Sequence, residues 1–585
     1  MRRSNSSPSV GRSNRRLFLE QLEQRNLLTS IPVALADPLY ATPVNTDLVI
    51  SAVASGVLNN DFDADADSLT ASTVTNPSNG SLVSFSSNGT FTYRPNTSFV
   101  GLDSFTYKAN DGSSDSNIVT VSIAVGGNFG VRTNQDDLPQ GATQGSPMLQ
   151  TGGLTLTQPL TLGHQLVYRS DTVNPRPVVV VETSLLATSA VPDSIDAQLT
   201  FGGVVGSTVS YTNTGLSAGE ALRFALQVDG SSLSTGWYDY TFTLTAHFGG
   251  SSYTRAYTGS QAVVNRTTSE FGKGWWVDGL DQLVISGSNA LLIRGNGDAL
   301  YFKGDGSGGY LKADGDKREM ALVKNGDNTF TLTSKYGLKH NFGTTGLLTS
   351  VVDPNSNTIG YTYSSGKLSL IDDAFGRDTS FSYTSGYLTS VTDHASRVTT
   401  LTQTSGKLTM VTHPDPDAGG SLAAPETDYA YDGTALLMTS TNDPLNYTTS
   451  FSYNSNTKRL STITHPDSTT WVLTPQQTMG WATSTGNALY DPADAVAQYV
   501  DERGKTWKFQ TDRFGNIKYF KDPLLNVTTT ERDHDGRPIR LTQADPDAGG
   551  ALTSPITKFG YNSSGDLVKQ YLPDGNVQTW TYHTT

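Results

Sequence analysis

The chain has 585 residues, a formal net charge of −14 and no cysteine. This length exceeds that of one ordinary domain, so we expect several. The acidic charge argues against a nucleic-acid partner, because such partners bind basic surfaces. Without cysteine the chain can form neither disulfides nor cysteine-ligated zinc sites. No stretch approaches the roughly 20 apolar residues of a transmembrane helix, so no transmembrane segment is predicted.

The composition favours β-structure throughout the chain. Charged residues make up 16% of it, whereas glycine (57), tyrosine (26) and phenylalanine (22) are abundant. Tyrosine, phenylalanine, valine and threonine favour positions in a pleated sheet, and glycine marks turns. We therefore predict an all-β protein, with β-sandwich domains in the N-terminal part and a repeat-built sheet in the C-terminal part.

Residues 1–36 form the first predicted segment, an export leader. It is rich in arginine, and Glu20, Glu23 and Arg25 interrupt the apolar core that a standard secretory signal needs. The segment resembles the short leader, rich in arginine, leucine and glutamate, of many large bacterial surface proteins. Small side chains in residues 31–36 suit cleavage by a signal peptidase. The resemblance implies an extracellular or bacterial cell-surface location. A disordered tail or a capping helix is the alternative.

Residues 37–126 form the second predicted segment, a β-sandwich. Apolar and polar residues alternate in Phe91-Thr-Tyr93, in Phe105-Thr-Tyr107 and over residues 119–125. Alternation of this kind is typical of antiparallel strands with one buried face. Residues 56–69 and 88–112 resemble the bacterial cadherin-like, immunoglobulin-type repeat of large adhesins. The resemblance implies cell adhesion and calcium binding.

Four carboxylates alternate along the loop inside this segment, and they are the only metal-site candidates that we single out: Asp61, Asp63, Asp65 and Asp67. Closely spaced hard oxygen ligands suit calcium. An EF-hand does not fit, because its sixth position would be Ala66 and its twelfth Ser72. In a cadherin-like site, Asp103 or Asp111 would close the coordination. The alternative is a solvated acidic loop without an ion.

Residues 127–265 are predicted to form a second β-sandwich-like region. Its strand signals include Leu166-Val-Tyr168, residues 178–181, residues 222–228 and residues 240–246. Residues 266–335 follow as a segment leading into the repeats, marked by Gly272-Lys-Gly-Trp-Trp276. We expect its two tryptophans to be core or lid residues rather than a ligand platform.

Residues 336–585 carry an internal repeat. Glycine recurs at a spacing of 20 residues, as do the leucine two positions later and the aromatic pairs, such as Tyr361 with Tyr363 and Phe381 with Tyr383. Each unit predicts two short strands, which must stack on neighbouring units because one hairpin is unstable alone. A long sheet of this kind must coil, because sheets twist.

These repeats resemble the YD repeats of the RHS family of bacterial surface proteins. The resemblance implies a β-solenoid or cocoon-like shell, which in relatives often encloses a C-terminal toxin. The Asp-Pro-x-Gly-Leu motif that usually separates the shell from the toxin does not occur in the repeat half, so we expect an incomplete shell.

Catalytic motifs are not evident in the sequence. The histidines of the repeat half fall in predicted turns, and no serine lies in a Gly-x-Ser-x-Gly elbow. We therefore predict a non-enzymatic surface or secreted structural protein, with an adhesion or scaffold role. One alternative is the shell of a toxin-delivery protein whose toxin, for example a nuclease, is absent. Another is a carbohydrate-binding surface protein, which would expose Tyr361 and Tyr363 to a cell-surface glycan. No cofactor other than calcium is expected.

Overall fold

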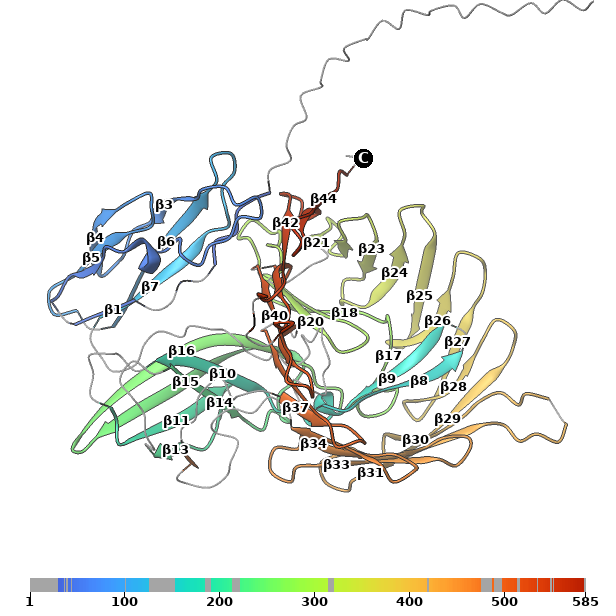
Figure 1. Cartoon of the computed structure of the whole chain (residues 1–585). Helices are drawn as coiled ribbons and strands as arrows, with labels where there is room; N and C mark the ends of the chain where they lie inside the picture. The colour runs from blue at the N-terminus through green and yellow to red at the C-terminus, as the bar shows by residue number, and fades with distance from the viewer. Residues whose placement is uncertain are drawn as a thin grey trace, which may run out of the picture.

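Figure 1 shows a computed structural model of the chain, built almost entirely of strands. It describes residues 30–125, 153–184, 191–212, 221–313, 320–417, 420–474, 487–488, 497–512, 516–547 and 550–582, apart from residues 36, 38, 39, 44, 100, 162, 534 and 551. Within these ranges the helical elements are the short 3-10 turns η1 (Val53–Ser55) and η2 (Ser170–Thr172). The all-β prediction is confirmed. In the part of the chain that is described, no helix has the length and apolar character of a membrane span.

The N-terminal domain is a β-sandwich of two largely antiparallel sheets. The first sheet has the order β1 (Tyr40–Thr42), β7 (Val119–Val125), β6 (Gly101–Asn110) and β3 (Thr70–Thr75). The second has the order β2 (Leu48–Ile50), β5 (Phe91–Pro95) and β4 (Gly80–Phe85). Alternate residues of these strands meet in the core, where Phe91, Tyr93, Phe105 and Tyr107 are fully buried.

A second β-sandwich follows. One sheet pairs β10 (Val178–Ser184) with β14 (Ala221–Gln227). The other has the order β16 (Ser251–Val263), β15 (Gly236–Phe248), β11 (Ser194–Phe201), β13 (Val209–Thr212) and β36 (Asn487–Ala488), with β12 (Val204–Val205) on β11. Strand β36 comes from within the repeat half of the chain, but it pairs with β13 of the sandwich and is not part of the repeat sheet.

Residues 127–152 of the predicted range 127–265 lie outside the described residues, and the sandwich does not include all of the rest. Strands β8 (Thr155–Thr161) and β9 (His164–Arg169), which include the predicted strand at residues 166–168, do not belong to it. They pair instead with β17 (Trp275–Val277) in a separate three-stranded sheet. Leu160, Leu166 and Tyr168 of this sheet are apolar and buried against the repeats, which is why the strands leave the sandwich.

A small sheet leads into the repeats. It has the order β18 (Gln282–Ser286), β19 (Asn289–Ile293) and β20 (Ala299–Phe302). The repeat sheet itself begins at residue 321, earlier than the predicted residue 336, because the hairpin before the first recognisable glycine repeat already pairs with it.

The repeat half forms one continuous antiparallel sheet, which contains 23 strands within the described residues. The strands follow chain order: β21 (Ala321–Lys324), β22 (Phe330–Thr333), β23 (Lys339–Phe342), β24 (Leu348–Val352), β25 (Thr358–Ser364), β26 (Lys367–Asp372), β27 (Thr379–Thr384), β28 (Tyr387–Thr392), β29 (Val398–Thr404), β30 (Lys407–Thr412), β31 (Glu426–Tyr431), β32 (Met438–Asn442), β33 (Thr448–Tyr453), β34 (Leu460–Thr464), β35 (Thr470–Thr474), β37 (Ala497–Val500), β38 (Thr506–Thr511), β39 (Ile517–Lys521), β40 (Val527–Arg532), β41 (Pro538–Thr542), β42 (Ile556–Tyr561), β43 (Leu567–Tyr571) and β44 (Val577–Thr579).

Most repeat units are hairpins with a bulge at a fixed place. In the unit of β25 and β26, the two turn residues Ser365 and Gly366 have φ of 50° and 77°, as a tight two-residue hairpin turn requires. The register shifts between Thr362 and Tyr363, and the same shift recurs in the hairpins β27–β28, β29–β30, β31–β32 and β33–β34. A bulge bends its strand and increases the local twist. Repetition of the bulge therefore curls the sheet.

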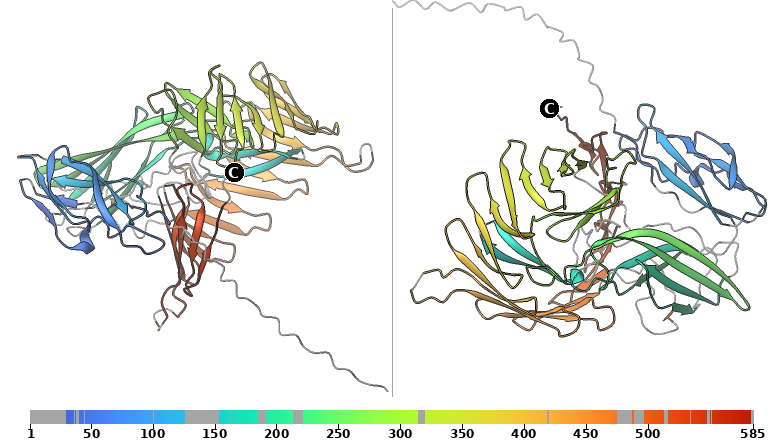
Figure 2. Two further views of the ribbon diagram at one scale, coloured as in Figure 1. Left: turned by 90° about the horizontal axis from the view of Figure 1, so that it is seen from above. Right: turned by 180° about the vertical axis from the view of Figure 1, so that it is seen from behind.

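The concave face of the curled sheet holds the core of the molecule. Figures 1 and 2 show β8 and β9 lying inside the curve formed by β24 to β31. Trp275 of β17 is fully buried there, and its indole N–H donates to the Tyr431 hydroxyl at 2.9 Å. Gly274 permits this approach, because a Cβ at its position would lie 2.2 Å from the side chain of Val173. Trp276 is half-buried beside it.

The two ends of the repeat sheet approach each other. The Lys335 ammonium lies 2.7 Å from the Asp566 carboxylate, and Lys312 lies 3.1 Å from Asp535. The turn between β42 and β43 therefore lies beside the turn between β22 and β23. The sheet thus forms a nearly closed turn, and its last strands carry the contact with the N-terminal domain.

Candidate functional site

The acidic loop before β3, residues 59–67, has a geometry set by one carboxylate. Asp63 Oδ1 accepts the backbone N–H groups of Asp65 (2.8 Å) and Asp67 (3.1 Å). Ala66 takes φ of 62°, which turns the chain between them. As a result, carboxylate oxygens of the three aspartates lie within 4.8 Å of one another.

This three-aspartate cluster is arranged like a cation site. Asp63 is only 7% exposed, and its Oδ2 is buried with no hydrogen-bond partner among the described residues. Burial raises the pKa of Asp63. A buried carboxylate oxygen without a donor is costly unless a ligand neutralises it, so the cluster suits a hard cation such as calcium.

The structure brings together three of the four predicted ligands and separates the fourth. Asp61 accepts the Leu35 amide at 2.9 Å and the Tyr107 hydroxyl at 2.9 Å, away from the cluster. The predicted closing residues also act elsewhere. Asp103 accepts hydrogen bonds from the Ser78 and Asn79 amides and the Tyr93 hydroxyl, and Asp111 accepts from the Ser113 and Ser114 amides. Neither belongs to the cluster, because each is used by its own turn.

The cluster is docked on the last strands of the repeat sheet, which the sequence did not predict. Lys569 of β43 lies 2.5 Å from Asp65 Oδ1, and the Tyr571 hydroxyl donates to the same oxygen at 2.7 Å. Burial alone would raise the pKa of Asp65, but the bonds from Lys569, the Ser30 amide and Tyr571 hold it below its usual value. The loop therefore has two roles, as a cation-site candidate and as an anchor between domains.

Apolar and cationic side chains surround this anchor. Phe62 and Ala64 bury Ile539 of β41 completely. The Arg540 guanidinium and the Lys558 ammonium lie 5.5 Å and 5.8 Å from the centre of the Phe62 ring. Cations over an aromatic face are attracted by its quadrupole, so the contact combines apolar burial with charge.

The predicted leader overlaps this contact. Residues 1–29 and 36 lie outside the described residues, but residues 30–35 pack with the N-terminal domain. Val33 bridges to Phe62, and the Ile31 amide donates to the Tyr561 carbonyl at 3.2 Å. The domain therefore begins before the predicted residue 37, because these short apolar residues pair with the acidic loop.

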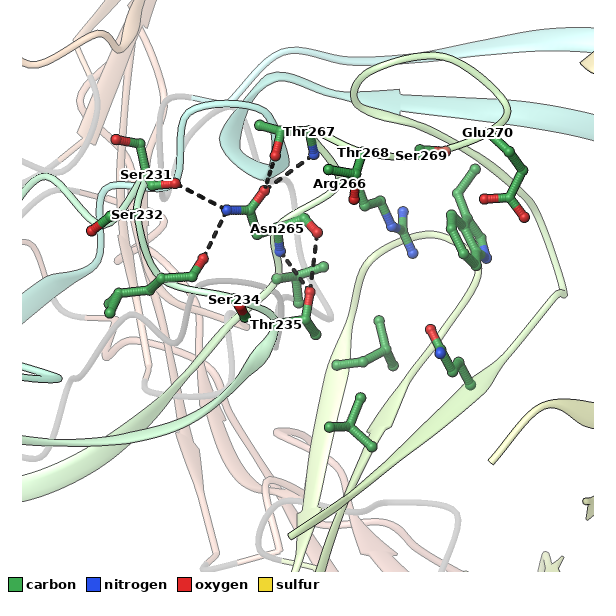
Figure 3. Close-up of a pocket in the computed structure, with 16 residues that line it drawn as sticks. Ser231, Ser232, Ser234, Thr235, Asn265, Arg266, Thr267, Thr268, Ser269 and Glu270 are labelled. Carbon is green, nitrogen blue, oxygen red and sulfur yellow. Dashed lines mark hydrogen bonds between the residues drawn. The ribbon is translucent and has the colours of Figure 1, made fainter. Parts of the chain in front are cut away.

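A pocket of about 570 Å³ lies elsewhere, between the second sandwich and the segment leading into the repeats (Figure 3). The Asn265 side chain braces its rim through donation to the carbonyls of Ser231 and Leu233. The Arg266 guanidinium is bound by backbone carbonyls and lies 5.0 Å from the Trp276 ring centre. Because Arg266 covers a face of that ring, the pocket lacks the open aromatic platform of a typical sugar site.

Comparison with known proteins identifies one part of the chain. Residues 30–127 match the family model described as the bacterial cadherin-like domain. The match supports the predicted cadherin-like segment. It also includes residues 30–35, which pack with the N-terminal domain. No curated protein matches the chain.

Solved structures resemble the chain only distantly. The crystal structure of TcdB2-TccC3 without its hypervariable C-terminal region is 10% identical, over 70% of this chain and 22% of that one, with a TM-score of 0.27. The Photorhabdus luminescens Tc holotoxin pore is 11% identical, over 70% of this chain and 22% of that one, with a TM-score of 0.27. A family 107 endo-fucoidan hydrolase is 16% identical over 40% of this chain and 29% of that one, with a TM-score of 0.14. The chain thus spans less than a quarter of the first of these, and TM-scores this low establish no shared fold.

Proposed function

We propose that the chain is an exported, non-enzymatic structural or interaction protein of the bacterial cell surface. In this proposal the repeat sheet is a scaffold, and the cadherin-like domain provides adhesion or spacing. The match of residues 30–127 to the bacterial cadherin-like domain supports a surface location. The observation that carries the scaffold role is the filled concave face, where β8, β9 and β17 pack against β25 to β35.

The filled face also bears on the toxin-delivery alternative. A shell that encloses a toxin needs free space on its concave side, whereas here Tyr168, Trp275 and Leu408 are buried in that space. Close-packed side chains leave no room for a second polypeptide. Over β25 to β35 the packing therefore favours a scaffold. A role in toxin delivery, suggested by the resemblance to RHS proteins, remains the second candidate.

Carbohydrate binding, the other alternative, would need Tyr361 and Tyr363 to form an exposed aromatic platform. Tyr361 and Tyr363 pack against the concave core, and the Tyr363 hydroxyl donates to the Leu348 carbonyl at 2.8 Å. Burial raises the pKa of Tyr361 to about 12. These rings stabilise the joint between units and are not a solvent-facing ridge.

Calcium is the cofactor that we assign to the acidic loop. The ligands would be Asp63, Asp65 and Asp67, because their oxygens converge and one of them is buried without a donor. Bound calcium would offset two of the three like charges of these carboxylates. Asp61 is not among the ligands.

Protease treatment of intact native cells, followed by peptide mapping, tests the surface role. We expect peptides of the repeat sheet to be released from intact cells, and intact-mass analysis to find no enzymatic domain attached to them. Peptides released only after lysis would contradict export. A longer species ending in a non-repeat domain would favour toxin delivery.

A further inference from the structure

The two surfaces that meet at the docked loop have opposite charge. The N-terminal domain contributes Asp63, Asp65 and Asp67, three acidic groups within one short loop. The repeat sheet contributes cations on the strands β41 to β43 that face the loop: Arg540, Lys558 and Lys569. Opposite charges at a contact favour docking, and neutralising one side removes that contribution.

Asp65 is the residue through which the two surfaces meet, and it is also a member of the cation cluster. Its side chain is 9% exposed and that of Lys569 is 12% exposed. Solvent and salt therefore screen the pair weakly. The Tyr571 hydroxyl donates to the same Asp65 oxygen at 2.7 Å, so strand β43 contacts the cluster through two side chains.

Lys569 neutralises only part of the cluster. Its ammonium contacts Asp65, whereas Asp63 Oδ2 is buried and has no hydrogen-bond partner in the described residues. A divalent cation would satisfy that oxygen and would carry the larger charge. A cation bound there would also lie close to the Lys569 ammonium in a weakly screened site, where like charges repel strongly.

We propose that a divalent cation and the Lys569 ammonium compete for Asp65, so that calcium binding releases the N-terminal domain from the repeat sheet. This inference rests on the proposed calcium site at Asp63, Asp65 and Asp67. In the calcium-free state, Lys569 acts as an internal counter-ion and holds the domain down. In the calcium-bound state, the ion offsets two of the three negative charges of the cluster, and the contact with Arg540, Lys558 and Lys569 loses most of its electrostatic attraction.

Calcium titration of the whole protein tests the competition. Calorimetry would compare the unaltered chain with Lys569→Gln and with the control Lys505→Gln, which removes an exposed lysine from a turn of the same sheet. We expect Lys569→Gln to bind calcium at least about tenfold more tightly, because the competing charge is gone. Lys505→Gln should bind like the unaltered chain. Equal affinities in all three would overturn the competition.

Fluorescence energy transfer tests the release. The chain has no cysteine, so Ser81→Cys on β4 and Gln578→Cys on β44 give two unique labelling positions, both exposed. We expect calcium to lower the transfer efficiency between them. Calcium that binds without changing the efficiency would overturn the coupling and leave the site intact.

Asp67→Asn separates the failure of the site from the failure of the coupling. Asp67 is exposed, and within the described residues only its backbone amide hydrogen-bonds in the loop, so docking should persist in this variant. We expect it to bind calcium at least tenfold more weakly and to keep high transfer efficiency when calcium is added. Unchanged calcium binding in Asp67→Asn, or no binding by any variant, would overturn the site and the inference together.

Discussion

Asp37 and Asp61 are neighbouring carboxylates buried near Tyr107 in the N-terminal domain. Burial and then the charge of Asp61 raise the pKa of Asp37 to about 8. Burial raises the pKa of Asp61 to about 6, in spite of hydrogen bonds from the Leu35 amide and Tyr107. Both pKa values lie above those of exposed aspartates, so folding disfavours the charged forms.

The pair makes the stability of this domain depend on pH. The folded domain favours the protonated form of both carboxyls, and this preference stabilises it at low pH. The stabilisation is fully present below the unfolded pKa near 3.8, and it is lost as the pH rises through about 6 for Asp61 and about 8 for Asp37. We expect Asp37→Asn to raise the free energy of local unfolding at pH 8 by roughly 1–3 kcal/mol and to change it little at pH 4. Hydrogen exchange of peptides from β6 and β7, with a chelator present, would measure this.

A matched variant controls for the loss of any carboxylate. Asp115 is an exposed aspartate of the same domain whose pKa is lowered by Lys108 and Asn110. Asp115→Asn should therefore gain no protection at pH 8. A gain for Asp37→Asn that is equal at pH 4 and pH 8 would contradict the electrostatic explanation.

At the scale of the element, one position of the repeat hairpin holds a polar residue in some units and a buried apolar residue in others. The third residue after the turn glycine is hydroxylic in four successive early units, and its hydroxyl donates to a carbonyl of the paired strand: Thr349, Ser369, Thr389 and Thr409. In two late units the same slot holds Ile539 and Val568, which are 0% and 1% exposed. Ile539 packs against Phe62 and Ala64 of the acidic loop, so the apolar residue at this position of its unit marks a surface that a distant part of the chain covers.

Gly560, which lies between the two aromatic residues of its unit, is a second residue that marks the covered surface. The corresponding residue is Thr362, Ser382 or Ala430 in other units. A Cβ at Gly560 would lie 2.8 Å from the Cβ atoms of both Ala64 and Ser30. The docked loop thus requires the absence of a side chain at this one strand position.

Placing the repeat's own side chain at that position should undock the domain. We expect Gly560→Thr to weaken the contact by roughly 1–3 kcal/mol, because the threonine overlaps Ala64 and Ser30. Peptides covering Ile539 should then exchange their amide hydrogens faster. Ser382→Thr, at the same slot of an exposed unit, should leave exchange unchanged. Unaltered protection of β41 in Gly560→Thr would show that the loop does not rest there.

At the scale of the whole molecule, the repeat sheet depends on partners far away in sequence. Thr399 donates to the Leu160 carbonyl at 2.6 Å, and the Met438 amide donates to the Tyr168 hydroxyl at 3.0 Å. The apolar core continues past these contacts to Leu460 of β34. The units are therefore held by a common core as well as by their neighbours.

Truncation after residue 440 tests this cooperativity. It removes Phe451, Leu460, Ile463 and Leu473 from the shared core and exposes the residues that they cover. It also removes the strands on which the N-terminal domain docks. We expect insoluble or unfolded material, measured as the soluble fraction and by circular dichroism. A soluble product that still protects the β17 amides would mean that the units fold independently.

The sequence alone determined the all-β fold class, the presence of an N-terminal sandwich and the hairpin repeat. These features depend on alternation, turn residues and spacing, which are local and can be recognised in a short stretch of chain. It also located the acidic loop, and Asp63, Asp65 and Asp67 do converge there. The convergence follows from two backbone hydrogen bonds within five residues of chain.

Only the tertiary structure decided which elements pack together. Strands β8 and β9 resemble sandwich strands in their length and apolar content, and only the apolar concave face of the coiled sheet explains why they pack there and not in the sandwich. Asp61 and Asp65 look equivalent in the sequence. In the structure Asp61 accepts a hydrogen bond from Tyr107, whereas Asp65 pairs with Lys569, which is 504 residues away in the chain. Long-range contacts of this kind depend on how the bulged hairpins together curl the sheet. The total curvature is a property of the whole sheet, and no local sequence pattern encodes it.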